Sequence, residues 1–227
     1  MAVRIGLIHS VLPAITAVES MFEKHWPEAQ RVSIYDQSLY IDLNSDRTMP
    51  PKVMWRVQNL VNHCVAADAD AILCTGSLFG KAIETARKEI DIPVLTSFEA
   101  LVETAFMVGN RFALIATDPG TNKLLNQDLQ IYAKRNKKPT PQTEAVFVDS
   151  AMKLISAGDQ KGHDTLVVNA AAKTKDCDAI LLGQFSMGPT KPLIEDQAKI
   201  PVLDAPESAV LKLKNIFENK TQSEQEV

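Results

Sequence analysis

Cysteine is scarce in this sequence of 227 residues, and its pattern excludes two kinds of stabilised domain. Cys64, Cys74 and Cys177 are an odd number, and no CxxC or Cys/His spacing joins them. The odd number argues against a disulfide framework, and the missing ligand spacing argues against structural zinc. We therefore expect free thiols, no metal site and no cofactor.

Long apolar runs and strong charge are also missing. The sequence has no run of 18 apolar residues, and its start, MAVRIGLIHS, lacks the charged and long apolar segments of a signal peptide. The formal net charge is -4, and the one basic run, KRNKK at 134–138, precedes PTPQ and is interpreted as a solvated loop or helix end. These absences predict a cytoplasmic protein with no membrane and no nucleic-acid partner.

What the sequence does contain is an internal repeat. The segment Asp70–Val102 aligns without a gap with Asp178–Val210, and 11 of its 33 positions are identical, including DAIL and IPVL. The beginnings of the halves agree more loosely, VRIGLIHS from Val3 against NRFALIATD from Asn110. Chance rarely produces this agreement, so we infer two similar halves.

Each half contains short apolar runs of strand length, separated by longer stretches of helical character. The expected strands are Val3–Ile8, Val32–Tyr35, Ala71–Cys74, Val94–Leu95, Phe112–Ala116, Ala145–Val148, Ala179–Leu182 and Val202–Leu203. The expected helices of the first half are Ile15–His25, Pro51–Ala67, Gly80–Glu89 and Phe98–Val108. Continuous rather than alternating hydrophobicity indicates parallel strands with helices on both faces.

The predicted fold is therefore α/β, with two similar lobes of parallel sheet flanked by helices and related by a pseudo-twofold internal repeat. Residues 1–108 form the first lobe and 109–215 the second, and the pattern allows the C-terminal helix to pack on the first lobe. Residues 216–227 are polar and charged, which predicts a flexible tail.

Polar residues follow the strands of both halves. Open parallel sheets bind ligands beyond the carboxyl ends of their strands, and two such lobes would face each other across one cleft. Hydroxyl and backbone N–H groups there can cradle an anion, although each Ser or Thr also suits a helix N-cap. Because these loops contain no Lys or Arg, a small carboxylate is favoured over a phosphate ester. The predicted substrate-binding residues are Ser10, Thr75, Gly76, Ser77, Thr117, Thr121, Phe185 and Ser186.

Two α/β lobes, each with a DAI strand that ends in a short polar loop and is followed by IPVL, resemble the aspartate/glutamate/hydantoin racemase superfamily over nearly the whole chain. In that superfamily each lobe supplies one cysteine, six residues beyond the Asp of this strand. One thiol removes the proton next to a carboxylate, and the other returns it on the opposite face. The resemblance implies an enzyme that acts on a small organic or amino acid, and it allows a homodimer.

The two cysteine positions of the superfamily hold Gly76 and Gln184 in this chain. Neither residue can exchange a proton near neutral pH, so the two-cysteine mechanism is not expected. Arylmalonate decarboxylase is similar in having a glycine at the first position, but it keeps the second cysteine. Cys74 lies two positions before Gly76, and Cys177 precedes the other strand. We interpret Cys74 as apolar strand filling, unless the end of its strand is shifted toward the cleft.

Proton transfer would then require another group. The predicted catalytic residues are Gln184, Asp36 and His9, since a carboxylate desolvated in the cleft could have its pKa raised into a useful range. His9 is equally explained as a buried, hydrogen-bonded histidine, and Asp36 as a structural position that recurs at Asp149. Turns and helix caps also explain two other strand-end carboxylates, Asp118 and Asp204. The remaining histidines are interpreted as surface residues: His25, His63 and His163.

Three functions from different classes are consistent with these residues. The first is a cofactor-independent isomerase or lyase that acts next to the carboxylate of a small organic or amino acid. The second is a carboxylate-binding pseudoenzyme with a regulatory role, which has kept the anion site and lost the thiols. The third is another α/β cleft protein, such as a solute-binding module, which the missing signal peptide disfavours. The fold alone does not decide between them.

Overall fold

The computed structural model describes residues 2–225 and contains eight strands within them. The strands are β1 (Arg4–His9), β2 (Gln30–Tyr35), β3 (Ala71–Cys74), β4 (Val94–Leu95), β5 (Arg111–Ala116), β6 (Gln142–Phe147), β7 (Ala179–Leu182) and β8 (Val202–Asp204). The helices are α1 (Leu12–His25), α2 (Ser38–Ile41), α3 (Pro51–Ala66), α4 (Gly80–Ala86), η1 (Arg87–Glu89), α5 (Glu99–Val108), α6 (Pro119–Arg135), α7 (Ala151–Ser156), α8 (Gln160–Ala171), η2 (Phe185–Thr190), α9 (Lys191–Ala198) and α10 (Ala205–Gln225). None of the described helices is both long and apolar enough to cross a membrane.

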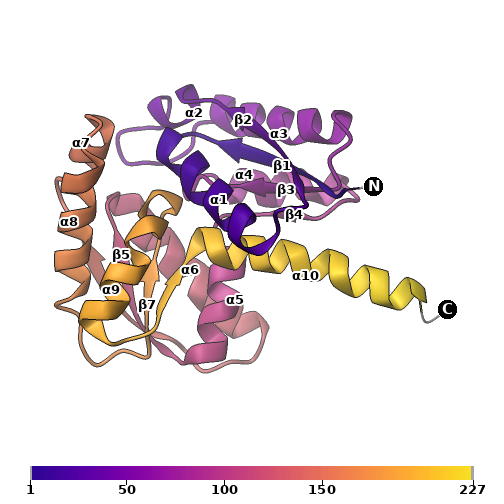
Figure 1. Ribbon diagram of the computed structural model, residues 1–227. Coiled ribbons are helices and arrows are strands. Elements are labelled where there is room, and N and C mark those ends of the chain that lie inside the picture. The colour runs from indigo at the N-terminus through magenta and orange to yellow at the C-terminus, as the bar shows by residue number, and fades with distance from the viewer. Residues whose placement is uncertain (1, 226–227) are drawn as a thin grey trace.

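The strands form two four-stranded sheets, which confirms the predicted two-lobed parallel α/β fold (Figure 1). The strand orders are β2-β1-β3-β4 and β6-β5-β7-β8, and the pairs between neighbouring strands are parallel. The register is equivalent in the two sheets: Ile8 pairs with Cys74 in one and Ile115 with Leu182 in the other. The sequence repeat is therefore a repeat of topology as well.

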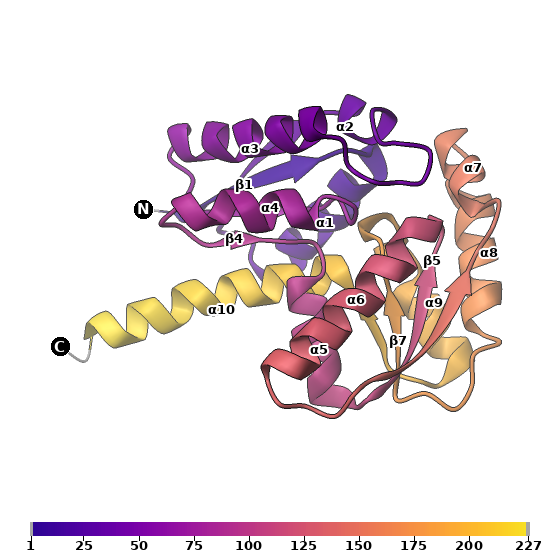
Figure 2. The same ribbon diagram turned by 180° about the vertical axis from the view of Figure 1, so that it is seen from behind.

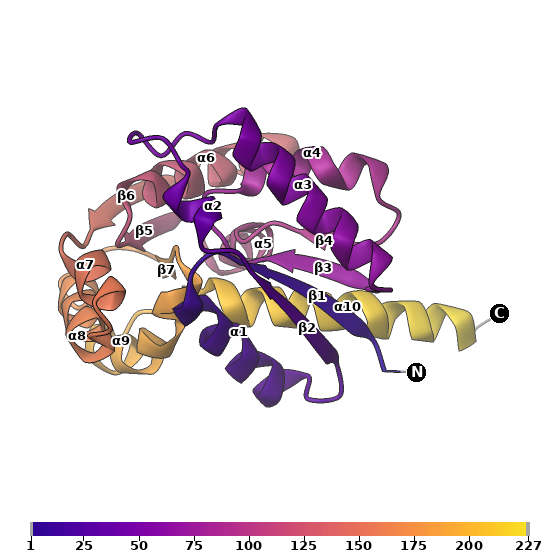
Figure 3. The same ribbon diagram turned by 90° about the horizontal axis from the view of Figure 1, so that it is seen from above.

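Helices cover both faces of each central strand, which explains the continuous apolar runs. All four residues of β3 and all four of β7 are buried. In the first lobe Leu73 packs in the cluster that contains Phe22 of α1, whereas Ile72 packs in the cluster that contains Val57 of α3. Figure 3 shows α1 and α10 on one side of this sheet and α3 and α4 on the other. A strand with two covered faces has no position for a polar residue until it ends.

The helix that follows each lobe's last strand crosses to the other lobe. Helix α5 leaves β4 and lies against β7, β8 and α6 of the second lobe, as seen from behind in Figure 2. Helix α10 leaves β8 and lies along α1 of the first lobe, where the ring centroids of Trp26 and Phe217 are 5.8 Å apart. One apolar cluster, which includes Leu73, Leu181 and Leu213, therefore runs through both lobes.

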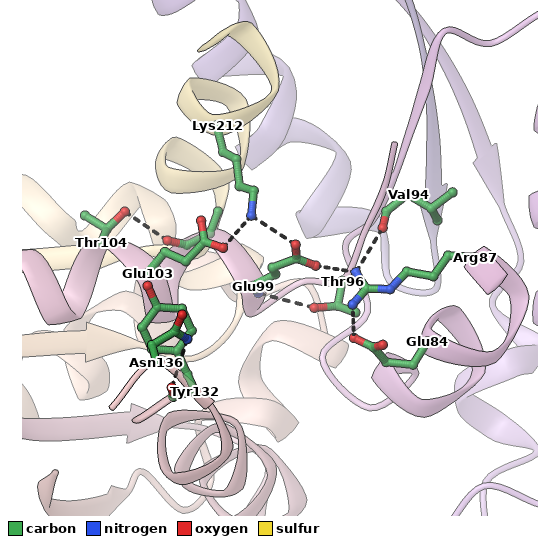
Figure 4. A network of polar contacts seen from close by, with 11 residues as sticks. Glu84, Arg87, Val94, Thr96, Glu99, Glu103, Thr104, Tyr132, Asn136 and Lys212 are labelled. Carbon is green, nitrogen blue, oxygen red and sulfur yellow. Dashed lines mark hydrogen bonds and ion pairs between the residues drawn. The ribbon is translucent and has the colours of Figure 1, made fainter. Parts of the chain in front are cut away.

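Equivalent carboxylates fasten the two crossing helices. Glu99 begins α5 and accepts hydrogen bonds from Arg87 (2.6 Å) and from Lys212 of α10 (2.9 Å) (Figure 4). Glu207, in the equivalent position of the repeat, lies in the first turn of α10 and binds cations of both lobes. Its partners are Lys24, His25 and Lys191.

Helix α10 continues farther than the sequence indicates. The polar composition of 216–227 predicts a tail, whereas α10 is helical through Gln225, and residues 226–227 lie outside the described part. The aromatic contact of Phe217 with Trp26 holds the middle of this helix on α1. A polar sequence alone does not reveal such support, because it comes from a residue distant in the chain.

Candidate active site

A cavity of about 450 Å³ lies between the lobes, beyond the carboxyl ends of β1, β3 and β7. Helices α2 and α7, which occupy equivalent places in the two halves, form part of its walls. The lining residues are Ser10, Val11, Leu12, Pro13, Ala14, Tyr35, Gln37, Tyr40, Ile41, Thr75, Gly76, Ser77, Leu78, Phe79, Met152, Ile155, Ser156, Gly158, Gln160, Gln184, Phe185 and Ser186. Seven of the predicted site residues are therefore brought together: the substrate-binding Ser10, Thr75, Gly76, Ser77, Phe185 and Ser186, and Gln184 from the predicted catalytic set.

Gln184 is held in one orientation by Thr117. Its Oε1 accepts hydrogen bonds from the backbone N–H of Thr117 (2.6 Å) and from the Thr117 hydroxyl (2.9 Å). Because both donors need an acceptor, the amide oxygen must face Thr117 and the Nε2 group must face away. Nε2 has no hydrogen-bond partner among the described residues, and Gln184 lines the cavity. At the second cysteine position the chain thus presents a fixed donor with no accessible pKa.

Gly76, at the first cysteine position, is closed off by an aromatic ring. A Cβ atom placed on Gly76 would lie 2.4 Å from Cδ2 and 2.7 Å from Cε2 of Phe79. Phe79 is buried and lines the same cavity. Glycine is therefore required here by the close approach of the ring rather than by backbone conformation.

Several polar groups left unbonded at the cavity are donors. The backbone N–H groups of Ser77, Leu78, Phe185 and Ser186 reach no acceptor within the described part of the chain. The same holds for the hydroxyls of Ser10 and Ser186. Hydrogen bonds from such donors are stronger to a charged acceptor than to a neutral one. An anion is the ligand that this arrangement suits.

Four predicted site hydroxyls are already engaged with the protein. Thr75 Oγ1 contacts His9 Nδ1 at 2.9 Å, and Ser77 Oγ contacts Thr121 Oγ1 of the other lobe at 3.1 Å. Thr117 and Thr121 are buried and do not line the cavity. Their contribution is indirect: Thr117 orients Gln184, and Thr121 links the loop of Ser77 to the second lobe.

His9 lies behind the cavity wall. Its ring is fully buried between Thr75 and Ser33, and it does not line the cavity. Desolvation by burial lowers the pKa of His9 to about 4, so the imidazole is neutral near pH 7. This placement is that of a structural histidine, the alternative that the sequence left open.

Asp36 is also outside the cavity lining, and it is paired. It accepts hydrogen bonds from the Ser38 hydroxyl (2.6 Å) and from Arg56. Burial alone would raise the pKa of Asp36, but the hydrogen bonds from Ser38 and Arg56 outweigh it, so the pKa is lowered. An ionised carboxylate held by arginine is a poor proton donor at neutral pH.

None of the three thiols is placed to exchange protons with a ligand in the cavity. Cys74, the last residue of β3, is buried and does not line the cavity. Desolvation raises the pKa of Cys74 to about 12. Cys64 is buried nearby, with its pKa raised by burial to about 11. Cys177 precedes β7, at the end of the sheet opposite the cavity, and burial raises its pKa too. Cys74 is therefore a buried core residue of β3.

The other strand-end carboxylates cap helices. Asp118 accepts a hydrogen bond from the backbone N–H of Gly120 at the start of α6, and Asp204 accepts one from that of Glu207 in α10. His163, interpreted from the sequence as a surface residue, is instead fully buried in α8, because the helix turns that position toward the core. No group of three or more potential metal ligands occurs among the described residues.

Tyr40 is a cavity residue that sequence reasoning missed. Its hydroxyl donates to Asp118 of the second lobe (2.8 Å), and Arg47 pairs with the same carboxylate (3.1 Å). Burial, followed by the charge of Asp118, raises the pKa of Tyr40. The sequence also did not indicate that Met152 and Ile155 of α7 line the cavity. Among these features only the closeness of a neighbour to Gly76 had a signal in the sequence, since glycine is one way to allow such an approach.

Comparisons with known proteins agree with this architecture. A model of the family described as Asp/Glu/Hydantoin racemase matches residues 8–213. An allantoin racemase from Klebsiella pneumoniae has a TM-score of 0.71 at 19% identity, covering 96% of this chain and 89% of that chain. A glutamate racemase from Bacillus anthracis has a TM-score of 0.69 at 15% identity, covering 96% and 82%.

Unliganded arylmalonate decarboxylase is similar too, with a TM-score of 0.60 at 16% identity, covering 93% of this chain and 91% of that chain. No protein with a curated description matches the sequence. At these identities the likeness to the solved structures shows the fold.

Proposed function

Since this chain belongs to the Asp/Glu/hydantoin racemase family, we propose that it binds a small carboxylate between its lobes and does not exchange protons with it through its own side chains. The observation that carries the proposal is the chemistry of the cavity. Its unbonded polar groups include the N–H and hydroxyl donors of both lobes, and none of its described lining residues is Asp, Glu, His, Cys, Lys or Arg. Donors without a carboxylate, imidazole, thiol or amine beside them support binding rather than racemisation.

The donors come from both lobes, which supports a ligand held between them. Ser77 and Leu78 belong to the loop after β3, and Phe185, Ser186 and the Gln184 amide belong to the segment after β7. A hydrogen bond to a charged acceptor contributes about 1.5–3 kcal/mol. Several such bonds can offset the desolvation of one carboxylate in the absence of a lysine or arginine.

The proposal is tested by thermal unfolding with a panel of carboxylates that includes acetate, aspartate, glutamate and 3-phenylpropionate, followed by proton NMR in heavy water with any compound that stabilises the protein. A ligand at 100 times its Kd stabilises by about 2.7 kcal/mol, which gives a readable shift in Tm. We expect stabilisation with no exchange of the proton next to the carboxylate. A panel without any binder, or exchange catalysed by the protein, would refute the proposal.

A lyase is the second candidate, and the free donors of the cavity favour it. Breaking the bond between a carbon and its carboxylate releases CO₂, and the electron pair moves onto an adjacent carbonyl to form an enolate. The N–H groups of Phe185 and Ser186 could stabilise that oxygen, while solvent water protonates the carbon. The step requires no protein acid. CO₂ release from a β-keto carboxylate, in excess of the rate without protein, would support it.

A further inference from the structure

We infer that the ligand of this cavity is a monocarboxylate with an apolar body and no ammonium group, such as an arylalkyl acid. This inference rests on the function proposed above and names the class of compound that fills the rest of the space.

An ammonium group would have no counter-charge in this cavity. None of the described lining residues is acidic. Asp118 lies behind Tyr40, but Arg47 pairs with it at 3.1 Å and the Tyr40 hydroxyl donates to it, so its charge is already satisfied. Asp36 is bound by Arg56 in the same way. A desolvated ammonium group without a partner is strongly disfavoured.

A second carboxylate is disfavoured for a related reason. The described lining contains no Lys, Arg or His, so the donors that hold an anion are neutral N–H and O–H groups. Two carboxylates on one ligand would repel each other at short range without a cation to offset the repulsion. These neutral donors therefore suit a ligand with a single negative charge.

Apolar side chains form much of the rest of the cavity, alongside the polar Gln37, Ser156 and Gln160. Phe79 lies at the floor beside Gly76, and Met152 and Ile155 of α7 form the wall supplied by the second lobe. At the mouth Leu12 is 59% exposed and Ile41 68% exposed, although both line the cavity. An apolar ligand would cover these side chains, and covering them is favourable in proportion to the area removed from water.

The size of the cavity agrees with this chemistry. An engineered cavity of roughly 150 Å³ holds one benzene molecule. The present cavity of about 450 Å³ can therefore hold a carboxylate together with a ring and a short linker. Aspartate or acetate would leave much of its apolar surface uncovered.

Four compounds that share one phenylpropyl skeleton test the inference by titration calorimetry. They are 3-phenylpropionate, phenylalanine, which adds an ammonium group, benzylmalonate, which adds a carboxylate, and 3-phenylpropan-1-ol, which removes the charge. We expect 3-phenylpropionate to bind at least about tenfold more tightly than each of the others. Acetate should bind more weakly as well, because it lacks the apolar body.

A variant supplies the missing counter-charge. Ile155→Asp places a carboxylate on the α7 wall, and Leu193→Asp makes the same change on an exposed side chain of α9 that does not line the cavity. We expect the preference for 3-phenylpropionate over phenylalanine to fall at least about fivefold in Ile155→Asp. The preference should be unchanged in Leu193→Asp.

The two proposals fail in different ways. If phenylalanine, aspartate or benzylmalonate binds as tightly as 3-phenylpropionate, the inference about the ligand class is overturned and carboxylate binding stands. An unchanged preference in Ile155→Asp overturns the charge argument in the same way. If none of the carboxylates binds, both proposals are overturned.

Discussion

The ring of Phe79 occupies the space that any side chain on Gly76 would need, because a Cβ atom there would lie 2.4 Å from Phe79 Cδ2. The superfamily's first cysteine position is thus closed by a residue three places later in the same loop. The absence of a thiol at position 76 and the closure of the space around it go together. One substitution cannot place a cysteine side chain here, since the ring would first have to move.

Gly76→Cys should therefore lower the free energy of unfolding. Overpacking a buried site costs about 1–3 kcal/mol. Phe79→Ala added to Gly76→Cys should relieve the clash, leaving the cost of the lost ring. The matched control is Gly80→Cys, because a Cβ atom on Gly80 meets nothing within 4 Å. Urea unfolding measures all of these variants, and a Gly76→Cys protein as stable as the Gly80→Cys protein would show that the ring moves freely.

Substitutions at Gln184 separate its two hydrogen-bonding roles. Gln184→Ala removes the acceptor for the buried Thr117 N–H and should destabilise the protein by about 1–3 kcal/mol. Gln184→Glu keeps an acceptor for Thr117 but replaces the free donor with a negative charge. We expect this variant to stay close to the parent in Tm and to lose anion affinity at least about tenfold. Equal affinity in Gln184→Glu would remove Gln184 from the binding site.

Thiol labelling distinguishes the three cysteines. Cys177 is half-buried, whereas Cys64 and Cys74 are buried with their pKa values raised to about 11 and about 12. The thiolate is the reactive form, so a thiol reagent near pH 8 should modify Cys177 first and the other two only after unfolding. Cys177→Ser should abolish the rapid phase. Rapid labelling of Cys74 in the folded protein would contradict its assignment as strand filling.

Glu207 should make stability depend on acid pH. Burial alone would raise its pKa, but hydrogen bonds from Lys191, Lys24 and His25 lower the pKa to about 2. A carboxylate with a lowered folded pKa stabilises fully above its unfolded pKa of 4.5, and the contribution is lost as the pH falls toward about 2.

Glu207→Gln should therefore cost about 2 kcal/mol at pH 7, and the difference from the parent should shrink as the pH falls from about 5 to about 3. Urea unfolding at several pH values measures the difference. Glu23→Gln, on the exposed face of α1, is the control and should be neutral throughout. A difference that does not change with pH would mean that the charge of Glu207 is not what stabilises the lobe junction.

Much of the fold could be predicted from local pattern. The DAIL and IPVL segments became β3, β4, β7 and β8 because continuous apolar runs fit only strands covered on both faces. Cys74 is buried as the apolar reading of its strand indicated. The polar loops after β3 and β7 do meet in one cavity, because the repeat places both at the carboxyl ends of parallel strands.

The sequence by itself determined the two-lobed α/β fold, the repeat and the absence of cysteine at positions 76 and 184, since these depend on residue identity and short-range periodicity. Only the tertiary structure decided that His9 and Asp36 lie outside the cavity, that Phe79 closes the space at Gly76 and that Tyr40 is bound to Asp118. The reason is physical. The direction of a side chain at a strand end, and its contacts with the other lobe, depend on residues distant in the chain, which no local pattern specifies.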